Sequence, residues 1–454
     1  MVKLNEQNRQ QYEDQILEML NQGERETFRE LFLELHPTDQ MDIFIELDTK
    51  LRKRVYDYVL PIEFAEVFQG LEVDEQKQAV QEMDKKYLYE VFNNMYADDV
   101  ADFLGEVQET KALEILTSMD QEEADEVKEL LSYEPETAGS IMTKEFISVS
   151  STDRADDVIE RLRKEGPDAE TVYYLYVVDD KGRLAGVVSL RDLIVASPSE
   201  IVENMMSTRV VSVAANTDQE EVANLIRKYD FLAAPVVTND GFLVGIVTVD
   251  DVMDVLEDEA TEDIGEITAA KGATDLNISS FTAAKRRSPW IILLMFFGMI
   301  TAGVIGTFED TLSEIVLLAV FIPLIMGSAG NCGTQSLAVM VRALATGSLE
   351  KKGLLHTIKR EFGTGILLGL ICAVVLVVII PVIYEGQFML GLIVGLSIFL
   401  SLSIATMIGA VVPVAINKLK LDPAIASGPF ITTVNDILGL LIYFSIATSL
   451  LRYL

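Results

Sequence analysis

Five long apolar stretches dominate the second half of the chain. They cover roughly Trp290–Phe308, Leu312–Val341, Gly363–Tyr384, Phe388–Ile416 and Ile425–Leu450. A helix needs about 20 mostly apolar residues to cross a bilayer, and each stretch has about that length or more. The pattern therefore predicts an all-α transmembrane domain of five helices over residues 287–454, with the lipid bilayer as a partner.

The residues between these stretches indicate how the spans are oriented. Lys and Arg gather before the first span, between the second and third, and between the fourth and fifth, at residues 285–287, 342–360 and 418–420. The connections around Glu309 and Glu385 carry neither. Because cytoplasmic loops are rich in Lys and Arg, we expect a multi-pass protein of the cell membrane with its N-terminus in the cytoplasm and its C-terminus outside.

The first 135 residues have a different periodicity. Apolar residues recur at spacings of three and four, and a turn followed by acidic residues and an apolar run appears four times, at residues 36–47, 60–71, 95–104 and 119–131. Acidic residues in a first turn suit the positive end of a helix. Residues 1–135 are therefore predicted to form an acidic N-domain of stacked short helices, similar to a solenoid.

A second repeat follows. The segment SIMTKEFISVSSTDRADDVIERLRKE aligns with NMMSTRVVSVAANTDQEEVANLIRKY, and GRLAGVVSLRDLI aligns with GFLVGIVTVDDVM. Each copy predicts a strand, a helix, two strands and a helix, an arrangement that resembles a tandem α+β CBS pair, with units at 136–200 and 201–260. By resemblance, Ser189 with Asp192 and Thr248 with Asp251 would meet the ribose of a nucleotide such as ATP or AMP; many CBS pairs bind none, so both readings stay open.

The charge balance separates the two halves of the chain. Residues 1–280 carry 25 Lys or Arg against 63 Asp or Glu, whereas residues 281–454 carry 11 against 8. Such acidity argues against nucleic-acid binding and favours divalent cations as partners. Both cysteines lie in the apolar half, which excludes a cysteine zinc site in the soluble half. No nucleophile–base pair or cluster of metal ligands appears there, so we do not expect an enzyme.

Asp436 lies near the middle of the fifth apolar stretch. An ionised Asp at the bilayer centre costs about 2.5–3.5 kcal/mol and commonly marks an ion path. At helical spacing Gly428, Thr432 and Asp436 share one face with Gly439, and Asn435 lies beside it. Carboxylate, amide and hydroxyl oxygens suit hard cations such as Mg²⁺ or Ca²⁺. The alternatives are a protonated Asp bonded to a neighbouring helix, or a purely structural residue.

The second apolar stretch contains PLIMGSAGNCGTQS at 323–336. Its proline and glycines predict a loosened helix, and Asn331 adds a polar side chain at membrane depth. Irregular backbone is tolerated there where it lines a cavity, which favours a pore-lining role. Close helix packing by small residues is the alternative.

An acidic run links the soluble half to the membrane half. Asp251, Asp254, Asp258 or Glu259, and Glu262 recur on one side of a predicted helix. Like charges at this spacing destabilise a helix, and a divalent cation would relieve the repulsion. We expect a cation sensor; a solvated helix end is the plain alternative. Residues 261–286 are predicted to form a connecting helix that reaches the first span.

Taken together, these parts resemble the MgtE family of magnesium channels and transporters, most specifically at 323–336 and at DPAIASGPFITTVNDILGLL (422–441). The resemblance implies a homodimer with Asp436 at a central pore lined by the second and fifth spans, including Asn331, Gly428, Thr432 and Asn435. It also implies a feedback sensor for Mg²⁺. The residues of this sequence that match the sensor pattern are Asp98, Asp99, Asp102, Asp251, Asp254, Glu259, Glu262 and Asp263.

The expected function is magnesium uptake across the cell membrane, selective for Mg²⁺ and closed by intracellular Mg²⁺ that binds the cytosolic domains. No Walker A loop is present, so no ATPase is expected. Two alternatives remain open. One is a proton-coupled transporter of divalent metals such as Co²⁺ or Mn²⁺, with Asp436 as proton carrier. The other is a CBS-regulated signalling protein whose spans only anchor a dimer.

Overall fold

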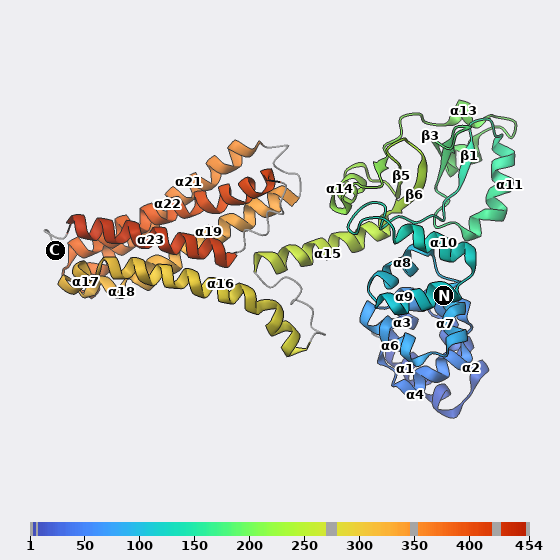
Figure 1. Ribbon diagram of the computed structural model, residues 1–454, viewed down its shortest axis with the longest axis horizontal. Helices are drawn as coiled ribbons and strands as arrows, with labels where there is room; N and C mark the ends of the chain where they lie inside the picture. Colours follow the sequence, from blue (N-terminus) through green and yellow to red (C-terminus); the bar gives the residue numbers. More distant parts are fainter. Residues whose placement is uncertain (1–2, 6–7, 269–278, 346–352, 420–427, 451–454) are drawn as a thin grey trace. The chain divides into compact units, whose positions relative to one another are not determined.

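The structure is a computed structural model that describes residues 3–5, 8–268, 279–345, 353–419 and 428–450. Its contacts divide the chain into two compact units, Met1–Leu256 and Glu257–Leu454 (Figure 1). The expected fold class, a helical N-domain and CBS pair followed by five membrane helices, is confirmed.

Short helices build the N-domain. In chain order they are α1 (Arg9–Gln22), α2 (Arg25–Glu34), α3 (Pro37–Glu46), α4 (Thr49–Tyr58), α5 (Pro61–Gln69), α6 (Val73–Glu82), α7 (Lys85–Phe92), α8 (Ala97–Gly105), α9 (Glu109–Ser118) and α10 (Gln121–Leu130). Side chains cap several of them: Asp48 accepts from the Leu51 amide at 2.9 Å and Asp84 from the Lys86 amide at 3.0 Å. Such caps satisfy amides that a helix start leaves open.

Aromatic side chains form the centre of this helical stack. Phe68 packs edge-on against Phe92 and Phe103, with ring centroids 5.6 and 5.8 Å apart. All three rings are fully or almost fully buried. Because buried aromatic rings supply large apolar area, this cluster fixes helices α5, α7 and α8 relative to one another, and α8 is the helix that carries Asp98 and Asp99.

Each CBS unit has one three-stranded sheet. In the first, β1 (Ser148–Ser150) pairs in parallel with β2 (Tyr174–Val178), which pairs antiparallel with β3 (Leu184–Ser189). In the second, β4 (Val213–Ala214), β5 (Ala233–Val237) and β6 (Leu243–Thr248) repeat that order. The helices of the pair are α11 (Ala155–Glu165), α12 (Leu190–Val195), α13 (Val202–Met205), α14 (Gln219–Tyr229) and α15 (Val249–Ile267). The strand–helix–strand–strand–helix order matches the predicted repeat.

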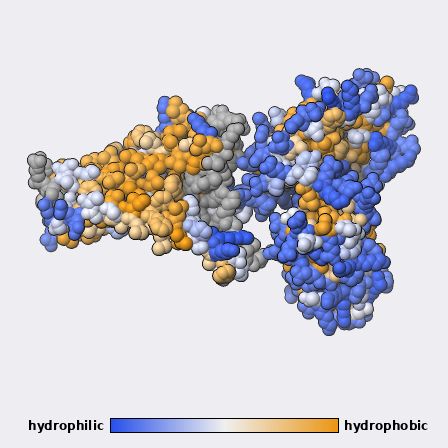
Figure 2. Space-filling model, in the orientation of Figure 1, coloured by the Kyte–Doolittle hydropathy of each residue, from blue (hydrophilic) through white to orange (hydrophobic). Residues whose placement is uncertain are grey.

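The membrane half contains five helical segments that are long and apolar enough to span a bilayer, among the described residues. Their helices are α16 (Ser280–Thr307), α19 (Ile322–Ala345), α21 (Leu354–Ile383), α22 (Phe388–Lys418) and α23 (Gly428–Leu450), and two short helices, α17 (Glu309–Glu314) and α18 (Leu317–Val320), precede α19. The outer surface of these helices is largely apolar, whereas that of the first unit is largely hydrophilic (Figure 2). The prediction of five spans is confirmed.

The loosened backbone predicted for the second span is wrong. Helix α19 runs without interruption through Gly327, Gly330 and Gly333, and Pro323 lies in its first turn, where its missing N–H is harmless. The glycines instead allow close approach. A Cβ atom on Gly333 would come within 2.0 Å of the Asn435 Nδ2 atom. The irregularity expected in this span lies earlier, where α17 and α18 end.

The predicted connecting helix over 261–286 divides between two elements. Helix α15 ends at Ile267, and α16 begins at Ser280, where the Ser279 hydroxyl accepts from the Thr282 amide at 3.2 Å. Residues 269–278 lie outside the described residues. The basic residues 285–287 therefore belong to the helix of the first span. Likewise, α21 begins nine residues before the predicted Gly363 and includes Glu361.

Candidate functional site

Asp436 lies against the second span. A Cβ atom on Gly330 of α19 would come within 3.3 Å of the Asp436 Oδ1 atom and within 2.5 Å of Thr432 Cγ2. One turn away, the hydroxyls of Thr334 and Thr432 are 3.2 Å apart. Gly428, Thr432 and Asp436 thus face α19, as their spacing predicts, and Gly330 is the residue whose lack of a side chain makes room for the carboxylate.

Asn435 packs beside this carboxylate and is almost fully buried. It lies over Gly333, and Gly409 of α22 approaches the other side of the same α19 turn: a Cβ there would be 2.2 Å from the Gly333 carbonyl oxygen. Within the described chain, the side-chain Nδ2 and Oδ1 atoms of Asn435 have no hydrogen-bond partner. The same holds for the Oδ1 atom of Asp436. Buried polar groups usually have partners, so these atoms mark a place for water or an ion.

Asn331 occupies another face of α19. Gly327, Asn331 and Gln335 are exposed and recur every four residues, so they form a polar stripe along the helix. The structure does not bring Asn331 to Asn435, which is buried. A polar stripe at membrane depth has to be covered by protein or line a watery cavity. Ala329 and Cys332 are both buried, and Ala329 packs near Gly439.

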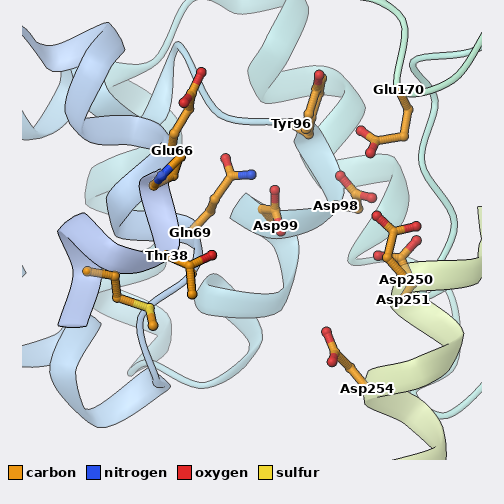
Figure 3. Close-up of a pocket in the computed structure, with 13 residues that line it drawn as sticks. Thr38, Glu66, Gln69, Tyr96, Asp98, Asp99, Glu170, Asp250, Asp251 and Asp254 are labelled. Atoms are coloured by element: carbon orange, nitrogen blue, oxygen red, sulfur yellow. The ribbon is translucent and has the colours of Figure 1, made fainter. Parts of the chain in front are cut away.

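A second candidate site is an acidic pocket in the first unit, with a volume of about 320 Å³. Figure 3 shows Asp98 and Asp99 of α8 facing Glu170 and the first turns of α15. Its wall carries seven carboxylates, together with the polar residues Thr38, Gln69 and Tyr96. The seven are Glu66, Asp98, Asp99, Glu170, Asp250, Asp251 and Asp254.

Burial and repulsion from neighbouring carboxylates raise the pKa values of four of these carboxyls, those of Asp98, Asp99, Glu170 and Asp251. The pKa of Asp98 lies well above its ordinary value, first because the group is buried and then because Asp99 and Asp251 are close. Burial, followed by repulsion from Asp251, raises the pKa of Asp99 and that of Glu170 to about 7. Burial also raises the pKa of Asp251, although a hydrogen bond from Thr248 opposes it. The ionised forms of these carboxyls are therefore destabilised in the pocket.

The pocket suits a hydrated cation better than a bare one. Among the described residues, no three His, Cys, Asp or Glu side chains converge closely enough to hold a metal ion directly. The Asp98 Oδ1 and Glu170 Oε2 atoms are buried and accept no hydrogen bond from the described chain. Mg²⁺ loses its waters reluctantly. At about 30 Å³ per water, six waters occupy roughly 180 Å³, which the cavity accommodates.

The predicted sensor residues do not all line this pocket. Asp98, Asp99, Asp251 and Asp254 do, whereas Asp102 is exposed on α8. Glu259, Glu262 and Asp263 lie further along α15, beyond the boundary of the first unit. Sequence reasoning missed Glu170 and Asp250 as site residues. Asp250 belongs to the acidic run and could have been included, but Glu170 follows a 3₁₀ turn and no local pattern marks it.

The two Ser/Thr-x-x-Asp motifs differ in their surroundings. Ser189 is the N-cap of α12; its hydroxyl accepts from the Asp192 amide at 3.1 Å and donates to the Asp192 carboxylate at 2.6 Å. Asp192 is exposed and Ser189 is partly buried. Thr248 is almost fully buried and donates to Asp251, which faces the acidic pocket. The second motif thus contributes to the acidic pocket rather than to an open surface.

Family models of known proteins match several parts of the chain. Residues 35–136 match the MgtE intracellular N domain, residues 138–199 and 202–258 match CBS domains, and residues 322–446 match a divalent cation transporter domain. The magnesium transporter MgtE of Bacillus subtilis is 42% identical over 97% of both chains. That of Thermus thermophilus is 39% identical over 96% of this chain and 97% of its own.

Two solved structures resemble the first unit. The soluble part of a magnesium transporter is 42% identical, with a TM-score of 0.54, and covers 56% of this chain and 99% of its own. The cytosolic domain of the Mg²⁺ channel MgtE in complex with ATP is 40% identical, with a TM-score of 0.52, and covers 54% of this chain and 99% of its own. Since identity of about two residues in five extends over nearly the whole length of curated relatives, this chain belongs to the MgtE family of magnesium transporters.

Proposed function

We propose that the chain carries Mg²⁺ into the cell through a pore at which Asp436 attracts the ion. The observation that supports this most directly is the place of Asp436: a carboxylate on a membrane helix, held over Gly330, whose Oδ1 atom has no donor among the described residues. A cation is the species that would offset this charge. The relatives named as magnesium transporters support Mg²⁺ as that cation.

The pore is proposed to lie on the axis of a homodimer. The exposed stripe of Gly327, Asn331 and Gln335 is polar, and a second copy would shield it from lipid. Two copies of Asp436 would then recognise a hydrated ion through its waters, because Mg²⁺ keeps its shell. The membrane potential would drive entry: moving charge +2 through 100 mV is worth about 4.6 kcal/mol, twice the single-charge figure.

The acidic pocket is proposed to be the intracellular Mg²⁺ sensor. When Mg²⁺ is scarce, the carboxylates of α8 and α15 repel one another; when it is plentiful, hydrated ions would neutralise the pocket and hold the N-domain on the CBS pair. Helix α15 would transmit the binding of Mg²⁺ in the pocket to the pore. It begins beside Asp250 and ends at Ile267, which packs with Leu337 of α19 and Ile431 of α23.

We further propose that ATP binds the CBS pair at Ser189 and Asp192, since this motif is more accessible than that of Thr248 and a relative's cytosolic domain holds ATP. Substituting both with Ala should weaken ATP binding measured by calorimetry. Unchanged binding would move the nucleotide elsewhere or exclude it.

The test of transport is flux into liposomes that contain the purified full-length chain. Asp436→Ala should abolish Mg²⁺ uptake while the protein still elutes as the same oligomer as wild type, and uptake should follow an imposed potential. Normal uptake by the variant would remove Asp436 from the pore. Uptake that follows a pH gradient would favour the proton-coupled alternative, and wild-type liposomes without flux would favour the signalling alternative.

A further inference from the structure

Two adjacent residues of the first CBS unit hold two different helices of the N-domain. The ammonium group of Lys144 pairs with the carboxylate of Glu129 on α10. The next residue, Glu145, accepts a hydrogen bond at 3.2 Å from the backbone amide of Ala97, the first residue of α8. The Lys144 side chain is only 18% exposed, so its pairing with Glu129 is partly shielded from solvent.

Lys144 and Glu145 are also held by hydrogen bonds within the CBS pair. The other carboxylate oxygen of Glu145 accepts from the Lys144 amide at 2.9 Å and from the Thr143 hydroxyl. Thr143 in turn exchanges two backbone hydrogen bonds with Ile246 of β6, at 2.8 and 3.0 Å. Strand β6 leads directly into α15. Lys144 and Glu145 are therefore held next to the strand that leads into α15, the helix that carries Asp250 and Asp251.

The pair also lies at the edge of the acidic pocket. The Glu145 carbonyl oxygen accepts from the Glu170 amide at 2.8 Å, and Glu170 lines the pocket. On the N-domain side, Ala97 precedes Asp98 and Asp99. The contacts of residues 144 and 145 thus hold together the two walls whose carboxylates repel each other. Neither contact needs a metal ion, and Glu145 also suits the positive N-terminal end of α8.

We propose that Lys144 and Glu145 form a metal-independent latch that sets the Mg²⁺ concentration at which the sensor closes. Closure has to overcome repulsion among the carboxylates of the pocket, and the latch supplies part of the attraction before any ion binds. Closure then requires a lower Mg²⁺ concentration than it would without the latch. The latch residues are positioning residues rather than Mg²⁺ ligands, so their loss shifts the set point and leaves the ligand set complete. This inference rests on the proposed feedback function.

The experiment measures the internal Mg²⁺ concentration that halves flux through the full-length protein in liposomes. Lys144→Ala should raise this concentration about three- to tenfold, which corresponds to the loss of one partly shielded ion pair. The matched control is Lys128→Ala, which removes the same charge from a pair with Asp125 inside α10. Glu145→Ala removes the acceptor of the Ala97 amide but also a carboxylate that repels Asp98, Asp99 and Glu170. It should therefore raise the concentration less than Lys144→Ala does, with Glu165→Ala, paired to Arg161 within α11, as its control. Flux at low Mg²⁺ should stay at the wild-type level.

Charge reversal separates a latch from a general structural role. Glu129→Lys alone should raise the half-inhibiting concentration, and Glu129→Lys with Lys144→Glu should return it toward the wild-type value. Failure of the double variant to recover, or control variants that shift as much as Lys144→Ala, would overturn the latch. Asp251→Asn distinguishes the latch from the feedback function. If Asp251→Asn relieves inhibition by internal Mg²⁺ while the latch variants do not, the latch is wrong and the feedback function stands. If internal Mg²⁺ does not inhibit the wild-type protein, the feedback function itself is wrong.

Discussion

The carboxylate of Asp436 and the backbone of Gly330 are so close that a methyl group does not fit freely between them: a Cβ at residue 330 would lie 3.3 Å from the Asp436 Oδ1 atom. The same Cβ would lie 2.5 Å from Thr432 Cγ2, a distance at which the Thr432 side chain or one of the two helices has to shift. The position of the proposed ion-binding group therefore depends on a glycine of the neighbouring helix.

Gly330→Ala should reduce Mg²⁺ flux about tenfold or more, because the added methyl displaces Thr432 and Asp436 from their places, and overpacking of this kind costs about 1–3 kcal/mol. Flux into liposomes measures the effect. Gly363→Ala on α21 is the matched control, since a Cβ there meets nothing within 4 Å. Equal flux in the two variants would show that Asp436 does not depend on the close approach.

Gly409→Ala should damage folding rather than conduction alone. Its Cβ would lie 2.2 Å from the Gly333 carbonyl oxygen and 3.1 Å from the Leu337 nitrogen, and both are backbone atoms of α19 that cannot rotate away. We expect a lower thermal midpoint in detergent and less monodisperse protein. Gly298→Ala, in open space on α16, should behave like wild type. A Gly409→Ala variant as stable as Gly298→Ala would mean that α19 and α22 are less closely packed than the structure describes.

The sequence predicts much of this architecture, because apolar runs and repeats are local signals. The spacing of Gly428, Thr432 and Asp436 correctly predicts a common face. The glycines of α19 mislead when read alone: they predict a loosened helix, whereas tertiary packing against Asn435 and Gly409 keeps the helix regular. Glu170 could not be found either, because only the fold brings it to Asp251.

Glu170→Gln tests whether this unpredicted residue belongs to the sensor. Its carboxylate is partly buried, its Oε2 atom has no partner within the described chain, and its pKa is raised to about 7 by burial and by Asp251. Removing its charge lowers the attraction for Mg²⁺, so the half-inhibiting internal concentration should rise about threefold to tenfold. Glu160→Gln, on the exposed face of α11, is the control. A set point equal to that of the control would exclude Glu170.

The acidic pocket should make the effect of Mg²⁺ on stability depend on pH. The pKa values of Asp99 and Glu170 are raised to about 7 when the N-domain lies on the CBS pair, so protonation favours the docked state. Without metal, docking should strengthen as the pH falls from 8 to 6, by about 1 kcal/mol per group after allowance for solvent screening. Mg²⁺ binds the deprotonated carboxylates, and its stabilising effect should therefore shrink over the same interval.

Thermal unfolding of the full-length protein in detergent, at pH 6, 7 and 8 with a chelator or with Mg²⁺, measures both trends. The shift in midpoint that Mg²⁺ produces should be largest at pH 8. A variant with Asp98→Asn, Asp99→Asn and Glu170→Gln should show a smaller shift that changes little between pH 6 and pH 8, because three groups with raised pKa values are gone while Asp250, Asp251 and Asp254 remain to attract the ion. A wild-type shift that stays constant from pH 8 to pH 6 would mean that these carboxylates remain ionised throughout, and that burial in the pocket does not govern their charge.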